Sequence, residues 1–181
     1  DYFLKQPKTY RALLQLGAET DSWDAYGEET AVMPVPPLTL EQITAATREL
    51  TGEVEQPIPF YSAKKIGGKR MYELARNGHE MERRYNTIQI YHWQDVRLVS
   101  PTQIEFTVVC SCGTYVRALG WLLAQKLGTT GHLCELRRLK IGELDVQNAM
   151  DGALIKESTP GAIYSRLIDV PGTPAEENHD A

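Results

Sequence analysis

The chain has 181 residues, of which 42% are hydrophobic and 24% charged, as expected for one globular domain with a full core. No apolar run approaches the roughly 18 residues that a membrane span needs, and no signal-peptide pattern opens the chain, so we expect no membrane association. The net charge of −5 argues weakly against a general polyanion binder. Three cysteines without CxxC spacing favour core thiols over zinc ligands, so we expect no metal and a reducing, cytoplasmic setting.

The first predicted element is a strand. Tyr10, Ala12 and Leu14 alternate with polar or outward positions, and Gly17 ends the run. The polar cluster at 20–27 fits a surface turn better than a metal site.

A helix is predicted after a proline-rich link. Thr39 and Gln42 have the spacing of a capping box, Ile43 and Leu50 lie on one helical face, and Gly52 closes the element. We expect this helix to be scaffold.

The next segment, at 58–86, is basic. From residue 64 to residue 84, seven cations stand against three acids, a local charge of +4 in a chain of −5. Tyr72 lies among these cations, and Tyr61 and Tyr85 flank them. Cations neutralise phosphates and aromatic faces stack on bases, so the segment predicts a nucleic-acid surface, with a solvated charged face as the alternative. Residues 69–77 have helical spacing, after a flexible break at Gly67 and Gly68. The cations are Lys64, Lys65, Lys69, Arg70, Arg76, Arg83 and Arg84.

The sequence pattern then predicts an antiparallel pair of strands at 87–99 and 103–112. A helix is predicted to follow at 116–127 and to end at Gly128. The second strand places its apolar residues on one face: Ile104, Phe106, Val108, Cys110 and Cys112.

Arg117 falls in the first turn of that helix, where a cation opposes the helix dipole by about 0.3–1 kcal/mol. We therefore expect an anion beside it, either a carboxylate or a phosphate. An ordinary structural salt bridge and a functional contact are equally compatible with the sequence.

The remaining elements are short. Arg137 and Arg138 precede a predicted strand at 140–144, and they either meet phosphates or close a sheet edge. A last helix is expected at 163–168, and residues 170–181 have the composition of a disordered acidic tail. Because hairpin-like strand pairs dominate over strand–helix alternation, the predicted fold class is α+β.

Five segments together resemble a known family. Lys-Thr-Tyr at 8–10, the turn at 20–27, IPFYSAKKIGGKRMYELARNG at 58–78, CGTYVRAL at 112–119 and LRRLKIGEL at 136–144 stand in the order found in bacterial TruB-type tRNA pseudouridine synthases. The likeness extends from about residue 1 to about residue 144, and the combination of segments is far more specific than any one of them.

The resemblance implies a mixed, largely antiparallel sheet flanked by helices, with an incomplete catalytic domain at 1–150, an RNA-gripping insertion at about 58–86 and a C-terminal extension at 151–181. It also implies isomerisation of uridine 55 in the T loop of tRNA, without a cofactor, by a monomer that takes the base out of its stack. We expect the insertion and the paired arginines 137 and 138 to bind the RNA.

The resemblance also implies roles for five residues. Tyr10 stacks on the flipped base and helps to remove its C5 proton, and Arg117 pairs with the catalytic aspartate and holds it ionised. Tyr115 and Leu136 line the pocket, and Asp24 orients the site.

The family's catalytic aspartate lies in a glycine-threonine-leucine-aspartate-proline segment ahead of the Tyr10 strand, and residues 1–181 contain no such segment. We therefore expect Arg117 to hold an acid that this chain does not supply, and the chain alone to be inactive. A PUA-type RNA-binding domain is also not expected within it. The alternatives are a non-catalytic tRNA-binding module or folding helper, and a protein-interaction domain with a basic patch.

Overall fold

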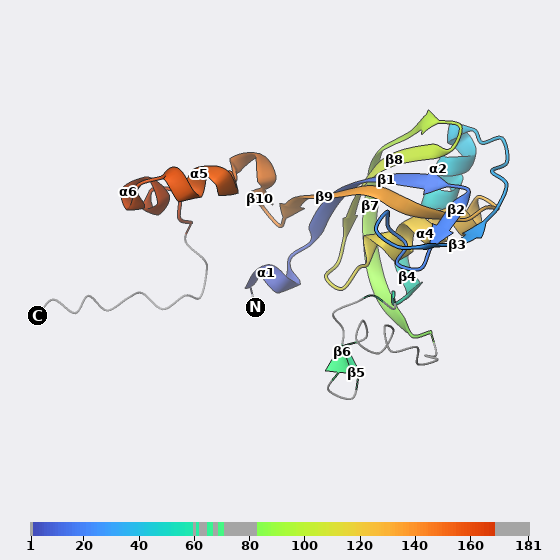
Figure 1. Ribbon diagram of the computed structural model, residues 1–181, viewed down its shortest axis with the longest axis horizontal. Helices are drawn as coiled ribbons and strands as arrows, with labels where there is room; N and C mark the ends of the chain where they lie inside the picture. The colour runs from blue at the N-terminus through green and yellow to red at the C-terminus, as the bar shows by residue number, and fades with distance from the viewer. Residues whose placement is uncertain (1, 60, 62–64, 67–68, 71–82, 169–181) are drawn as a thin grey trace, which may run out of the picture.

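The computed structural model describes residues 2–59, 61, 65–66, 69–70 and 83–168. It is built on a six-stranded sheet in the order β10-β9-β1-β8-β7-β4 (Figure 1). The strands are β1 (Lys8–Leu16), β2 (Ala18–Thr20), β3 (Glu29–Val32), β4 (Gly52–Pro57), β5 (Lys65–Ile66), β6 (Lys69–Arg70), β7 (Tyr85–Ser100), β8 (Gln103–Cys110), β9 (Gly131–Ile141) and β10 (Leu144–Asp145). The helices are α1 (Tyr2–Lys5), α2 (Leu40–Glu49), α4 (Val116–Lys126), η1 (Val146–Asn148), α5 (Gly152–Glu157) and α6 (Pro160–Tyr164).

All strand pairs in the described part of the sheet are antiparallel, which confirms the predicted α+β class. Strand β1 lies between β8 and β9, with Ala12 opposite Phe106 on one side and Leu136 on the other. The β7–β8 hairpin confirms the predicted strand pair, and β7 extends the expected element at both ends.

Helices α2 and α4 cover one face of this sheet and enclose the core. The alternation of β8 places Ile104, Phe106 and Val108 in that core with no exposed surface, because every second side chain of a strand points to the same face. Helix α2 begins with the predicted capping box of Thr39 and Gln42, and it ends at Glu49, before the expected stop at Gly52.

Three predicted elements differ in extent. Cys112 was expected on the buried face of β8, but β8 ends at Cys110 and Cys112 is exposed beyond it. A helix was expected from Lys69, but Lys69 and Arg70 form a short strand, β6, paired with β5, and the rest of the expected helix lies outside the described residues. The short strand expected at 140–144 is the end of a long one, because β9 continues to Ile141 and folds back into β10.

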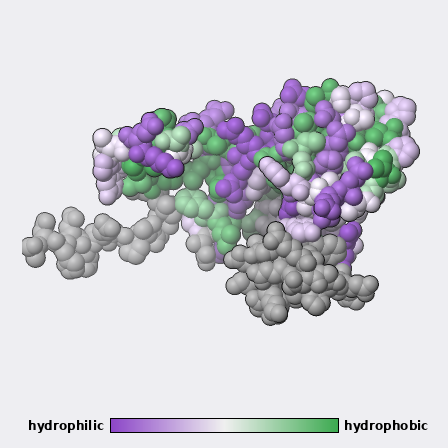
Figure 2. Space-filling model, in the orientation of Figure 1, coloured by the Kyte–Doolittle hydropathy of each residue, from purple (hydrophilic) through white to green (hydrophobic). Residues whose placement is uncertain are grey.

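The segment after β10 extends away from the sheet (Figure 1). Neither α5 nor α6 has a buried residue, and Leu154, Ile155 and Tyr164 are exposed. Hydrophobic surface is visible over these helices in Figure 2. The last helix lies at Pro160–Tyr164 instead of 163–168, because Thr159 caps its first turn and Pro160 starts it. The predicted acidic tail lies outside the described residues. Among the helices that are described, none is long and apolar enough to cross a membrane.

Candidate active site

The site lies where β8 turns into α4. Gly113 takes a φ of +81°, a left-handed conformation that glycine adopts without strain, and Tyr115 is the N-cap residue of α4. The Tyr115 side chain makes no capping hydrogen bond. Arg117 therefore lies in the first turn of α4, as predicted. Because the N-cap side chain does not bond to this turn, hydrogen bonds to the start of the helix come from other segments of the chain.

The guanidinium of Arg117 binds three acceptors from two distant segments. Its Nη1 donates to Asp24 Oδ2 at 2.8 Å and to the carbonyl oxygen of Ser22 at 2.8 Å, and its Nη2 donates to the carbonyl oxygen of Tyr61 at 2.9 Å. The side chains of Arg117 and Asp24 are only 20% and 24% exposed. Asp24 is therefore the anion expected beside a cation in the first turn of a helix, and this carboxylate belongs to the chain itself.

The Asp24 carboxylate is held by its own turn. Its Oδ1 accepts hydrogen bonds from Ser22 Oγ at 2.7 Å and from the Tyr26 amide at 3.1 Å. Backbone hydrogen bonds also join this turn to β9. The Leu133 amide donates to the Trp23 carbonyl at 3.0 Å, and the Ala25 amide donates to the Leu133 carbonyl at 2.9 Å. One carboxylate oxygen thus fixes the turn and the other faces Arg117.

Trp23 precedes Asp24 and takes a strained backbone conformation, with a φ of +58°. A bulky residue persists in this region only when its surroundings hold it there. Its ring stacks on Trp121 of α4 with centroids 5.0 Å apart, its Nε1 donates to Glu19 at 3.0 Å, and the Arg83 guanidinium lies 5.1 Å from its ring centroid.

Glu19 links this indole pair to the loop after α4. Its second oxygen accepts a hydrogen bond from Thr130 Oγ1 at 2.6 Å. Burial is the largest single effect on this carboxyl and raises its pKa, but the hydrogen bonds from Thr130 and Trp23, together with the Arg83 charge, outweigh burial and lower the pKa. The carboxylate form is therefore the one that this environment favours.

Two open clefts meet at the Arg117–Asp24 pair. One, of about 470 Å³, has an apolar wall formed by Leu133 and Leu136. The other, of about 600 Å³, lies on the side of Tyr61 and Glu28. Both are also lined by Tyr26, which is 99% exposed. Leu136 and the ion pair line the same cleft.

The structure brings three of the five predicted catalytic residues together. Asp24, Arg117 and Leu136 line the same cleft. Tyr115 starts the helix that carries Arg117, and Tyr10 packs partly buried against the core, opposite Arg138 of β9. Sequence reasoning expected Arg117 to be reserved for an acid from outside the chain. The pair with Asp24 differs from that expectation, because the turn at 20–27 folds back onto α4.

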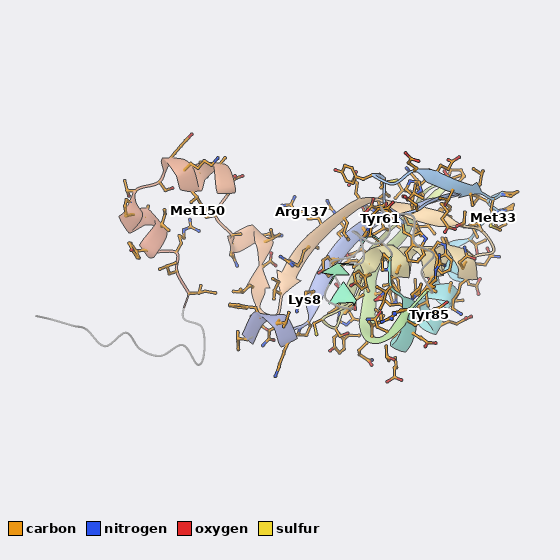
Figure 3. The ribbon with its side chains drawn as sticks, turned by 60° about the horizontal axis from the view of Figure 1, so that its bottom comes forward. Lys8, Met33, Tyr61, Tyr85, Arg137 and Met150 are labelled. Carbon is orange, nitrogen blue, oxygen red and sulfur yellow. The ribbon has the colours of Figure 1, made fainter. Side chains whose placement is uncertain are left out.

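The predicted RNA-binding cations are distributed differently. Lys64 and Arg76 lie outside the described residues, and Lys65, Lys69 and Arg70 belong to the β5–β6 hairpin. Arg83 lies over the Trp23–Trp121 pair. The remaining three are exposed: Arg84, Arg137 and Arg138. Arg137, labelled on β9 in Figure 3, lies opposite the exposed Arg11 of β1, so two like charges stand side by side on the sheet. Within the described ranges, no group of three or more metal-ligating side chains occurs.

Sequence reasoning missed two features of the site. Gln56 is fully buried and bonds the backbone of Tyr115. Its signal was present, since a polar residue between Val54 and Ile58 interrupts the apolar face of a strand. The stacking of Trp121 on Trp23 was also missed, although Trp121 lies four residues after Arg117 on the same helical face.

Comparison with known proteins places the chain in a family. The model of the TruB family pseudouridylate synthase N-terminal domain matches residues 1–116. A protein of Chlamydia pneumoniae named tRNA pseudouridine synthase B is 37% identical over 155 residues, which are 86% of this chain and 65% of that protein. The protein of the same name from Caldanaerobacter subterraneus subsp. tengcongensis is 36% identical over 156 residues, again 86% of this chain and 55% of its own length.

The chain therefore belongs to the TruB family of pseudouridylate synthases. It spans about two thirds or less of the length of these curated relatives. Two solved structures share its fold. The structure of an H/ACA RNP bound to a substrate RNA containing 2'-deoxyuridine matches with a TM-score of 0.53 and 20% identity over 82% of this chain and 32% of its own. A Cbf5-Nop10-Gar1 complex matches with a TM-score of 0.53 and 24% identity, over 81% of this chain and 34% of its own.

Proposed function

We propose that this chain is part of a tRNA pseudouridine synthase that isomerises uridine 55 in the T loop of tRNA. In this proposal, residues 1–150 belong to the catalytic domain, 58–86 form an insertion that grips the RNA, and 151–181 extend beyond the domain. The family membership and the names of the relatives support the reaction class. The proposed enzyme is a cytoplasmic monomer.

The observation that carries the proposal is the Arg117–Asp24 ion pair at the wall of a cleft of about 470 Å³. The pair is partly shielded from water, so its charges act more strongly on a bound group than they would at an open surface. Leu136 offers an apolar face for a flipped base, which loses its stacking partners when it leaves the RNA.

The reaction breaks the bond between N1 of the uracil and C1' of the ribose, turns the base, and forms a bond between C5 and C1'. The C5 proton is lost and N1 gains a proton, so no oxidant or cofactor is required. We assign the covalent step to the aspartate that the family resemblance implies, and its orientation to Arg117. Tyr10 and Tyr115 are assigned to the base, and Asp24 to holding Arg117 in place.

The RNA contacts are assigned to cations on both sides of the cleft. Arg137 and Arg138 are exposed on β9, one and two residues beyond Leu136, and Arg84 is exposed where the insertion rejoins the sheet. Backbone phosphates of a stem-loop whose base enters the cleft would lie near these positions, and each contact contributes to a salt-dependent affinity.

The test uses the complete gene product that carries residues 1–181, with a tRNA transcript tritiated at C5 of its uridines. Release of tritium by the wild-type protein is the expected result. Arg117→Lys keeps the positive charge but loses the planar guanidinium whose N–H groups reach three acceptors. We therefore expect turnover to fall about 100-fold with tRNA binding retained. Arg97→Lys, in the exposed pair with Glu105, is the matched control and keeps full turnover.

Tight tRNA binding by the wild-type protein without tritium release would overturn the catalytic proposal in favour of a tRNA-binding module or folding helper. Salt-independent binding, or none, would favour a protein-interaction domain.

A further inference from the structure

Gln56 is a fully buried amide in β4 with no exposed surface. Val54, on the same face of β4, and Ile58, just beyond the end of the strand, are also buried. A primary amide placed in an apolar layer is costly unless both its donor and its acceptor are satisfied. The partners of the amide are therefore informative.

Both ends of the Gln56 amide bind one residue, Tyr115. Gln56 Nε2 donates to the Tyr115 carbonyl oxygen at 3.0 Å, and the Tyr115 amide donates to Gln56 Oε1 at 2.8 Å. The Tyr115 carbonyl also accepts the first hydrogen bond of α4, from the Leu119 amide at 3.0 Å. Gln56 thus holds the N-cap residue of α4 by both of its own backbone groups, while the Tyr115 side chain makes no capping hydrogen bond.

A second amide holds the same corner. Asn86 lies opposite Gln56 in the β4–β7 register, and its Nδ2 donates to the Gly113 carbonyl at 3.2 Å. The corner is therefore bound at two points to the β4–β7 pair, across a glycine that would otherwise leave it free to pivot. Arg117 follows Tyr115 by two residues.

We propose that Gln56 is a positioning residue for the reaction assigned above: by fixing the backbone of Tyr115 it sets the direction of the Arg117 guanidinium toward Asp24. This inference rests on the proposed function. Among the described residues Gln56 has no exposed surface, so it acts on the reaction through Tyr115 and Arg117 and not by touching the RNA.

The first test compares Gln56→Met with Gln15→Met in the complete gene product, by steady-state tritium release from T-loop RNA. Methionine keeps the volume of glutamine and removes both hydrogen bonds. We expect kcat to fall about 10- to 100-fold for Gln56→Met with KM unchanged, because a misdirected guanidinium affects the transition state and not the RNA surface. Gln15 donates to the carbonyls of Leu16 and Thr102 at the far end of β1, and Gln15→Met keeps the wild-type kcat.

The second test uses Gln56→Glu, which restores the amide geometry only while its carboxyl is protonated. Burial raises the pKa of such a carboxyl, so we expect the kcat of this variant, relative to wild type, to decline from about pH 6 to about pH 8.5. Ionisation of a buried carboxyl also weakens the fold, so the unfolding midpoint of Gln56→Glu is measured over the same pH range. A fall in kcat at pH values where the variant is still fully folded separates positioning from a general loss of stability.

A wild-type kcat in Gln56→Met, or equal losses in Gln56→Met and Gln15→Met, would overturn the inference while the wild-type activity still supports the proposed function. A flat relative pH profile in Gln56→Glu would also overturn it. A wild-type protein that releases no tritium would instead overturn the proposed function itself.

Discussion

Trp121 stacks on Trp23 one helical turn beyond Arg117, with ring centroids 5.0 Å apart. The turn that carries Asp24 is therefore held to α4 by two side chains on one helical face, an ion pair at residue 117 and an aromatic stack at residue 121. The stack explains how Trp23 keeps a backbone conformation that few non-glycine residues adopt.

The first prediction concerns this stack. Trp23 is 3% exposed, so Trp23→Ala removes a large buried ring and should lower the free energy of unfolding by about 3–5 kcal/mol. Urea denaturation followed by circular dichroism measures the change. Tyr26→Ala, three residues away in the same turn, is the control, because Tyr26 is 99% exposed and its loss should cost no more than about 0.5 kcal/mol. Similar effects for the two variants would show that the stack does not hold the turn.

The second prediction concerns the ion pair. Asp24→Ala leaves the Arg117 charge partly buried without its carboxylate, and we expect the free energy of unfolding to fall by about 1–3 kcal/mol. The Arg97–Glu105 pair offers a contrast, because Arg97 is 66% exposed and Glu105→Ala should cost about 0–1 kcal/mol. Thermal unfolding of both variants measures the two losses of stability. A larger loss for Glu105→Ala than for Asp24→Ala would contradict the prediction.

The third prediction concerns pH. Because the folded environment lowers the pKa of Glu19, its carboxylate stabilises the fold above the ordinary glutamate value, and this contribution is lost as the pH falls through the folded pKa. Between about pH 5 and about pH 3 the wild-type protein should therefore lose more stability than Glu19→Gln does. Denaturant midpoints across this range test it, and parallel pH profiles for the two proteins would contradict it.

The fourth prediction concerns thiol reactivity. Burial raises the pKa of Cys110 to about 11, against smaller opposing effects of Thr114 and Lys8, and burial also raises the pKa of Cys134. Cys112 is exposed just beyond β8. Since the thiolate is the reactive form, iodoacetamide at about pH 8 should alkylate Cys112 first and Cys110 last, by a factor of about 100 or more. Peptide mapping after timed quenching measures the order, which should disappear in urea.

Local patterns predicted β1, α2, β7, β8 and α4, but they did not predict the short strands β2 to β6 or the contacts between distant segments. The period-two run of β8 and the period change at Tyr115 identified the strand and the helix, because side-chain spacing is set by backbone geometry. The extent of β9 was not predicted, since Arg137, Arg138 and Lys140 break the apolar alternation of an exposed strand end without breaking the strand.

In the candidate site, too, the sequence predicted the local features and not the contacts between distant residues. The position of Arg117 in a first helical turn predicted that an anion would accompany it, but not which one, because Asp24 lies 93 residues away and only the folded turn brings it close. Gln56 shows the complementary limit. A polar residue on an apolar strand face signals a buried contact, but the partner, Tyr115, lies 59 positions further along the chain and cannot be identified from the local pattern.

The three acceptors of Arg117 all precede it in the chain, Ser22 by 95 residues and Tyr61 by 56. During synthesis the turn at 20–27 and Tyr61 leave the ribosome well before the cation that joins them. The ion pair can thus form only after α4 has emerged, so a nascent chain that stalls earlier displays the turn at 20–27 with its carboxylates but without the guanidinium that pairs with Asp24.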